Sequence, residues 1–189
     1  MSATESTRRV FLLGFMGAGK TSVGQALARR LGWTFVDLDE LIERRQQKSV
    51  AAIFAEDGEA VFRQMERAGL AELLEPEIDS TGPGPSAGGL VAALGGGAFA
   101  QPANRNAIEY AGAMSILLEA PIEELQRRCE NDLKVRPLAQ DQQVFAQLFA
   151  ERQSAYELAG FRADTMDKSV EEVAAEIERM IMATVKPEV

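Results

Sequence analysis

The chain has 189 residues, 46% of them hydrophobic and 26% charged, a composition typical of a globular protein with enough apolar material for one core. Its net charge of −9 at pH 7 makes nucleic acids and anionic membrane surfaces unfavourable partners. With one cysteine and no histidine, the sequence excludes a disulfide framework, a thiolate or histidine metal site and a histidine base, and it fits a reducing cytoplasm.

The first nine residues are polar, and no later apolar run approaches the roughly 20 residues that a membrane span needs. We therefore expect neither a signal peptide nor a membrane segment. We expect a cytoplasmic monomer whose partners are small molecules.

The first element is the apolar run "RRVFLLG", residues 8–14, which is typical of a buried parallel strand that stops at a glycine. Apolar residues then recur at helical spacing, which predicts a helix from Lys20 that closes at Gly32: Val23, Ala26, Leu27 and Leu31.

The turn between this strand and this helix reads "GFMGAGKT", residues 14–21, and fits the P-loop pattern G-x-x-x-x-G-K-[ST] in the context that the pattern requires. Glycines allow the backbone to wrap a phosphate with its N–H groups turned inward. The start of the helix adds unpaired N–H groups and its dipole. Lys20 would lie between the β- and γ-phosphates of ATP or GTP, and Thr21 would offer a hydroxyl to Mg²⁺.

The next predicted strand, "WTFVDLD", covers residues 33–39 and ends in two carboxylates, Asp37 and Asp39. The carboxyl ends of strands in an open α/β sheet face the binding crevice, and side chains two residues apart along a strand point the same way. One carboxylate could serve Mg²⁺ and the other could orient a hydroxyl for attack. A polar strand end or a helix N-cap before "ELIERR" explains the same residues equally well.

Helices are predicted over residues 49–54 and 59–74, on either side of a break at "EDG". Arg63 lies in the second of these helices, where a surface arginine is the commoner interpretation. Residues 80–89 read as a Gly/Pro/Ser loop. The strand "LVAALGGG" then ends at Gly95, Gly96 and Gly97, where a ligand could lie against the backbone or the chain could simply turn.

A fourth strand is predicted over residues 113–121 and a helix over 122–130. The segment "NDLKVRPLAQDQQ", residues 131–143, has no clean period and contains Arg136. The remaining predicted elements are a helix over 145–158 that carries Arg152, a strand in 161–167, and a last helix whose Ser169 and Glu172 form a capping box. Strands that alternate with helices predict an α/β domain with a mainly parallel sheet.

Taken together, these pieces resemble the shikimate kinase family, within the superfamily of P-loop small-molecule and nucleoside-monophosphate kinases. The resemblance runs from about residue 10 to about residue 181. It depends on the following motifs in order: "GFMGAGKTSVG", "DLD", "IFAEDGEAVFRQME", "LGGG", "RPL" and "ERQSAY".

The resemblance implies a three-layer α/β/α P-loop kinase with a central, mainly parallel five-stranded sheet. Residues 1–189 would form a single kinase domain, with a small helical substrate-binding lobe over about 40–75 and a lid over about 131–144. The implied reaction is the ATP-dependent phosphorylation of shikimate to 3-phosphoshikimate, on the pathway to chorismate and the aromatic amino acids.

The resemblance also implies roles for individual residues. Asp39 would bind the shikimate hydroxyls and act as the base or stand near it, and Arg63 and Arg152 would pair with the substrate carboxylate. The remaining implied substrate contacts are Gly96, Gly97 and the lid residue Arg136, which would close over the phosphoryl group.

On the nucleotide side, Lys20 would stabilise the transferring phosphate, and Thr21 would ligate Mg²⁺ with Asp37 acting through water. The implied ATP-binding residues are Gly17, Ala18, Gly19, Lys20, Thr21, Ser22 and Arg128, of which Arg128 would stack on adenine. The segment "ADTMDKS" lacks an obvious adenine-contacting proline, so the loop that binds the base stays unassigned.

Two alternatives stay open at this point. A gluconate-type sugar-acid kinase shares the P-loop and the fold, although the Asp-x-Asp, Phe-Arg and triple-glycine set argues against it. A non-catalytic module that senses an aromatic acid would be expected to lose Lys20, Thr21 or Asp39, all of which this chain keeps.

Overall fold

The computed structural model describes residues 8–75, 89–130 and 141–184. Its centre is a five-stranded, fully parallel sheet in the order β2-β3-β1-β4-β5. The strands are β1 (Arg9–Leu13), β2 (Thr34–Asp37), β3 (Leu90–Ala93), β4 (Met114–Glu119) and β5 (Phe161–Asp164). Because all strands run the same way, their carboxyl ends lie at one edge of the sheet, where an α/β protein binds its ligands.

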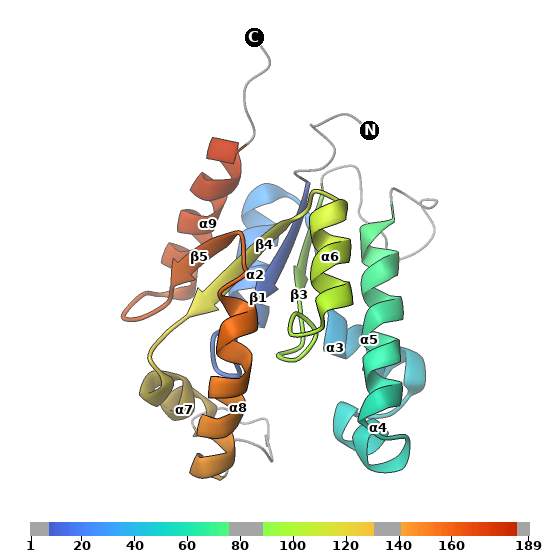
Figure 1. Cartoon of the computed structure of the whole chain (residues 1–189). Helices are drawn as coiled ribbons and strands as arrows, with labels where there is room; N and C mark the ends of the chain where they lie inside the picture. Colours follow the sequence, from blue (N-terminus) through green and yellow to red (C-terminus); the bar gives the residue numbers. More distant parts are fainter. Residues whose placement is uncertain (1–7, 76–88, 131–140, 185–189) are drawn as a thin grey trace.

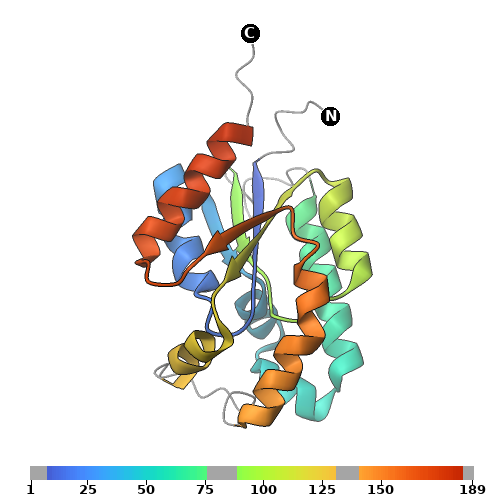
Figure 2. The same cartoon turned by 60° about the vertical axis from the view of Figure 1, so that its left-hand side comes forward.

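Helices cover both faces of this sheet, so the predicted three-layer α/β/α architecture is confirmed (Figures 1 and 2). One face is covered by α2 (Lys20–Leu31) and α9 (Val170–Thr184), which pack against each other. The other face is covered by α5 (Glu59–Leu74), α6 (Pro102–Tyr110) and α8 (Gln142–Tyr156).

Three further helices lie toward the carboxyl edge of the sheet: α3 (Leu38–Gln46), α4 (Val50–Glu56) and α7 (Ile122–Glu130). Helix α3 packs on α5 and α4, so these three helices form one lobe beside the sheet. Among the helices of the described ranges, none is long and apolar enough to cross a membrane.

Strands β1 and β3 are buried along their whole length, as their apolar runs VFLL and LVAA predict. In the sheet, Val10 of β1 pairs with Val91 of β3 on one side and with Met114 of β4 on the other. Helix α2 ends at Gly32, whose φ of 66° is left-handed, so the predicted glycine cap is confirmed. A rigid core therefore supports the loops at the carboxyl edge.

All five predicted strands are present, and the boundaries of α2, α5 and α7 are as expected. The capping box of α9 is also confirmed, because the Ser169 and Glu172 side chains bond each other's backbone N–H groups. The prediction that strand β2 extends to Asp39 is wrong, since the chain turns into α3 directly after Asp37.

The remaining differences are small. Helix α8 begins three residues before the predicted start, because Asp141 caps it by accepting bonds from the N–H groups of Gln143 and Val144. Residues 142–144 of the predicted lid therefore belong to this helix. The rest of the lid (131–140) and most of the Gly/Pro/Ser loop (80–88) lie outside the described residues.

Candidate functional site

The loop between β1 and α2 forms the backbone nest that the P-loop pattern predicts. Gly17 and Gly19 have φ angles of 83° and 86°, which a side chain would strain. Gly17 also packs so closely on the carbonyl oxygen of Leu125 that no Cβ could fit there. Ala18 of this loop is buried, and Ser22 follows in the first turn of α2. The N–H groups at the start of this helix can therefore face an anion.

Lys20 reaches back over this loop. Its Nζ donates to the carbonyl oxygens of Gly14 at 2.9 Å and Phe15 at 3.1 Å. The ammonium group is thus held at the mouth of the nest, where a phosphate would meet its charge.

Thr21, in the first turn of α2, and Asp37, at the end of β2, are joined directly. The Thr21 hydroxyl donates to Asp37 Oδ2 at 2.8 Å. Asp37 Oδ1 caps helix α3 by accepting from the Asp39 N–H at 3.1 Å. The predicted pair of Thr21 and Asp37 therefore lies together, with hydroxyl and carboxylate oxygens that suit Mg²⁺.

Asp39 belongs to the first turn of α3, so the expectation that it shares a strand face with Asp37 is wrong. Both carboxylates reach the same site for a different reason: the N-cap interpretation of Asp37 is correct, and the helix that it starts carries Asp39 into the crevice. Helix formation outcompetes strand extension here because the Asp37 side chain satisfies N–H groups that a strand would leave to another partner.

The Asp39 carboxylate is poorly solvated. Its Oδ1 is buried and has no hydrogen-bond partner among the described residues. Burial, followed by the negative charges of Asp37 and Glu66, raises its pKa from 3.8 to about 6, while the charge of Lys20 acts in the opposite direction. An unpaired carboxylate oxygen in such surroundings is suited to accept a hydroxyl group of a ligand.

Three consecutive glycines after β3 bring the rest of the site together, each against a different charged side chain. A Cβ on Gly95 would collide with Asp39 Oδ1. A Cβ on Gly96 would lie 2.7 Å from Arg152 Nη1, and one on Gly97 would lie 2.5 Å from Arg63 Nη1. Asp39, Arg63 and Arg152 come from α3, α5 and α8 and therefore surround one short loop.

Arg63 is not the snorkelling surface residue of the alternative interpretation. Its side chain is only 16% exposed and bonds Glu66 through Nη1 at 2.6 Å and Glu59 through Nη2 at 2.8 Å. Its guanidinium also lies over the rings of Phe54 and Phe62, at 5.9 and 5.7 Å from their centroids. These contacts hold the guanidinium against Gly97.

Glu66 is a site residue that sequence reasoning missed. Its side chain is 1% exposed, and its Oε1 has no hydrogen-bond partner among the described residues. Burial raises its pKa, and the charges of Arg63 and Arg152 oppose that rise. The available signal was its place three residues after Arg63 on one helix face.

Arg152 lies between the triple-glycine loop and the P-loop residue Phe15. Its guanidinium lies 5.5 Å from the centroid of the Phe15 ring. That ring in turn makes edge contacts with Phe145 and Phe149 of the same helix, at centroid distances of 4.9 and 5.3 Å. Arg136, the third predicted substrate arginine, lies outside the described residues.

A hollow of about 360 Å³ adjoins the other side of the P-loop. It is lined by residues of the P-loop, of α7 and of the segment after β5, including Gly17, Ser22, Arg128, Thr165 and Lys168. Arg128 is fixed there by Glu124, at 2.7 Å, and by the hydroxyl of Thr165, at 2.9 Å. The segment after β5, which had no assigned role, thus lies beside the phosphate nest and is bonded to Arg128.

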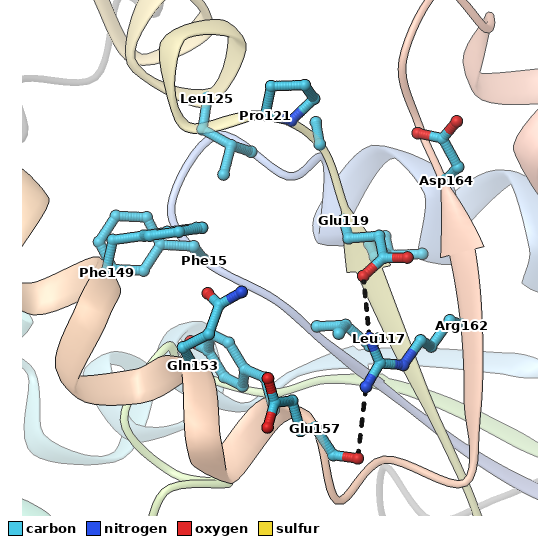
Figure 3. A pocket seen from close by; sticks show the side chains of 13 residues that line it. Phe15, Leu117, Glu119, Pro121, Leu125, Phe149, Gln153, Glu157, Arg162 and Asp164 are labelled. Carbon is cyan, nitrogen blue, oxygen red and sulfur yellow. Dashed lines mark hydrogen bonds and ion pairs between the residues drawn. The ribbon is translucent and has the colours of Figure 1, made fainter.

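A second hollow, of about 280 Å³, opens between α7, α8 and the ends of β4 and β5 (Figure 3). Phe15 and Phe149 lie on one side of it, and Arg162 lies on the other, paired with Glu119 at 3.6 Å. Phe15 therefore contacts both this hollow and Arg152, whose guanidinium lies over the same ring.

The chain is similar to known proteins along most of its length. The family model described as shikimate kinase matches residues 16–182. A shikimate kinase from Geobacter metallireducens is 40% identical over 180 residues, which are 94% of this chain and 93% of that protein. The solved structure of shikimate kinase from Acinetobacter baumannii in complex with shikimate has a TM-score of 0.82 at 33% identity and covers 97% of both chains.

The fold is shared more widely. A gluconokinase from Sinorhizobium meliloti 1021 has a TM-score of 0.55 at 16% identity, over 95% of this chain and 92% of that one. At this identity the likeness concerns the fold alone.

Proposed function

The chain belongs to the shikimate kinase family, and we propose that its site transfers the γ-phosphoryl group of ATP to shikimate, giving 3-phosphoshikimate and ADP. The reaction is a step toward chorismate and the aromatic amino acids. The observation that carries the proposal is the triple-glycine loop, which gathers one carboxylate and two guanidinium groups beside a P-loop. That set matches an acceptor that has both hydroxyl groups and a carboxylate.

ATP binds with its phosphates in the nest of the P-loop. The N–H groups of Gly17, Ala18 and Gly19 and the start of α2 surround the phosphates, and Lys20 leaves its carbonyl partners for the β- and γ-phosphates. Ser22 and Arg128 line the adjoining hollow, where the rest of the nucleotide lies.

Shikimate binds on the other side of the P-loop. Arg63 and Arg152 offer planar donor groups to its carboxylate, for which the paired geometry of guanidinium is well suited. The N–H groups of Gly96 and Gly97 have no hydrogen-bond partner among the described residues and face the same ligand. Asp39 accepts from the shikimate hydroxyls through the oxygen that is otherwise unpaired.

In the reaction, an oxygen of shikimate forms a bond to the γ-phosphorus while the bond between that phosphorus and the β–γ bridging oxygen breaks. The hydroxyl proton passes to Asp39, whose raised pKa of about 6 suits a group that takes up a proton near neutral pH. Lys20 neutralises charge on the transferring phosphoryl group. Because this chemistry depends on positioning and charge, the absence of histidine does not impede it.

Thr21 and Asp37 fit a magnesium ion. Among the described residues, no group of three or more His, Cys, Asp or Glu could hold a metal ion. Mg²⁺ at a kinase site, however, needs only one or two protein oxygens besides the phosphates. Thr21 would bind the ion and Asp37 would act through its water shell. When bound, the ion would neutralise phosphate charge.

Further parts of the proposal concern the whole molecule. Helices α3, α4 and α5 make up the predicted substrate-binding lobe over about residues 40–75 of a single kinase domain. The segment around Arg136 acts as a lid over the phosphoryl group, and the protein works as a cytoplasmic monomer. Closing the lid would exclude water, which competes as acceptor.

A shikimate-dependent ADP-release assay tests the proposed function. We expect ADP release with ATP, Mg²⁺ and shikimate, and only background release with gluconate or with no acceptor. Equal release with gluconate would favour a sugar-acid kinase, and binding of shikimate without release would favour a sensing module. Either result would contradict the proposal.

A further inference from the structure

Tyr156 occupies a distinctive position at the end of α8. Its side chain is buried, with 5% of the residue exposed, and its hydroxyl donates to the carbonyl oxygen of Gly96 at 2.6 Å. The two residues that this hydrogen bond connects are 60 positions apart in the chain. This bond is therefore a link between the last helix of the site and the triple-glycine loop.

Tyr156 also follows Arg152 by one helical turn on the same helix. Arg152 Nη1 lies at the position that a Cβ of Gly96 would occupy, so the two side chains contact the same glycine. Tyr156 also lines the 280 Å³ hollow together with Phe15, although only 5% of the residue is exposed.

The consequence follows from the planarity of the peptide bond. In a trans peptide, the C=O of one residue and the N–H of the next lie in one plane and point in opposite directions. The peptide bonds of the described residues are all trans. By fixing the carbonyl of Gly96, the Tyr156 hydroxyl therefore fixes the direction of the Gly97 N–H. That N–H has no hydrogen-bond partner among the described residues.

We propose that Tyr156 is a positioning residue that orients the peptide between Gly96 and Gly97, so that the Gly97 N–H and Arg152 meet the acceptor carboxylate together. This inference rests on the proposed function, since it assumes that an acceptor lies against the glycine loop. Tyr156 itself touches neither substrate. Its high pKa of about 12, which burial causes and the charge of Arg152 partly offsets, keeps the hydroxyl protonated as a donor at all working pH values.

The test is Tyr156→Phe, which removes one oxygen atom and keeps the ring. We expect the KM and Kd for shikimate to rise about tenfold, because the carbonyl of Gly96 loses its partner and the peptide can rotate. The KM for ATP and the kcat at saturating shikimate should stay within about threefold of wild type, the pattern of lost ground-state binding.

Substitution by 4-aminophenylalanine, Tyr156→4-aminophenylalanine, provides a graded second variant, since the amine is a weaker donor than the hydroxyl. Its KM for shikimate should fall between those of wild type and Tyr156→Phe. If Tyr156→Phe does not fold, the KM of this second variant tests the positioning role. The matched control is Tyr110→Phe at the chain's other tyrosine, which is 97% exposed and should leave every constant unchanged.

A second measurement uses the NMR signal of the Gly97 backbone amide. The amide resonance of Gly97 should shift on shikimate addition to wild type and should shift much less in Tyr156→Phe. Unchanged shikimate constants in both Tyr156 variants, or an equal loss for ATP and shikimate, would overturn the positioning role. A wild-type protein that releases no ADP with shikimate would instead overturn the proposed function, so the two failures are distinguishable.

Discussion

The guanidinium of Arg63 lies directly against the backbone of Gly97: a Cβ on that glycine would lie 2.5 Å from Nη1 and 2.6 Å from Nη2. The two residues belong to α5 and to the loop after β3, so their contact joins two elements that are distant in the sequence. Arg63 can therefore occupy this position only because residue 97 has no side chain.

Gly97→Ala should therefore impair the use of shikimate. The backbone of this residue does not require glycine, because its φ is not in the left-handed region. The new methyl group would instead displace Arg63, and displacement by about 1 Å can cost on the order of 100-fold in kcat/KM. Steady-state kinetics with each substrate varied will measure this, and the KM for ATP should hardly change.

The control for this variant is Gly160→Ala. A Cβ there would lie 3.6 Å from Ser115 Oγ, an ordinary contact, so activity should be that of wild type. If Gly97→Ala were as active as Gly160→Ala, Arg63 would not need its observed position.

Arg63→Ala should act on the acceptor and not on the nucleotide. It removes a donor for the shikimate carboxylate and leaves the buried Glu66 without its partner, a loss of about 2–5 kcal/mol in shikimate binding and stability together. Calorimetric titration with shikimate and with ADP separates the two ligands. The matched control is Arg67→Ala, an exposed arginine one turn later on the same helix. Equal shikimate affinity in both variants would show that Arg63 does not bind the acceptor.

The sequence predicts those parts of the fold whose residues follow local rules. Continuous apolar runs predict the buried strands, and the P-loop is recognisable because strand, glycine spacing and helix coincide. Helix α6 was not predicted, since its nine residues include only two that are buried and its start lacks a capping side chain.

The candidate site is less predictable because its parts meet only in three dimensions. No local pattern indicates that α3, α5 and α8 each send one charged side chain to a different glycine of the same loop. The family resemblance supplied Asp39, Arg63 and Arg152, but not Glu66 or Tyr156. The role of Asp37 as a cap also competes with strand extension, and sequence alone could not decide between them.

Asp39→Asn should reduce kcat by a factor on the order of 10²–10⁴, because the amide cannot take up the hydroxyl proton. ATP and ADP should bind as they do to wild type, since the carboxylate faces the acceptor. Initial rates at saturating substrates, with ADP affinity measured separately, will test this. Asp57→Asn, at an exposed position in the same lobe, is the control. Turnover close to wild type would remove Asp39 from the mechanism.

The same substitution should make the protein more stable when neither nucleotide nor Mg²⁺ is present. In the folded state the pKa of Asp39 is raised from 3.8 to about 6, so folding disfavours its ionised form. That cost is complete above pH 6 and disappears below pH 3.8, and it amounts to about 3 kcal/mol. Denaturant unfolding should show Asp39→Asn to be more stable at pH 7.5, by a margin that shrinks toward pH 4. A margin independent of pH would contradict the raised pKa.

Thr21→Val should weaken magnesium-dependent binding selectively. The hydroxyl that bonds Asp37 at 2.8 Å is lost, while the backbone nest stays intact. We expect the affinity for Mg²⁺–ADP to fall at least tenfold, on the order of one lost ligand to the ion, and the affinity for ADP with EDTA to stay the same. Thr21→Ser should restore Mg²⁺ dependence. Equal losses with and without the metal would assign Thr21 a structural role instead.

The most direct test of the account is a crystal structure of the protein with ADP and shikimate bound. We expect the ADP phosphates in the nest around Lys20, the shikimate carboxylate within hydrogen-bonding distance of both Arg63 and Arg152, and a shikimate hydroxyl on Asp39. Shikimate bound elsewhere, or bound with its carboxylate away from these two arginines, would contradict the account.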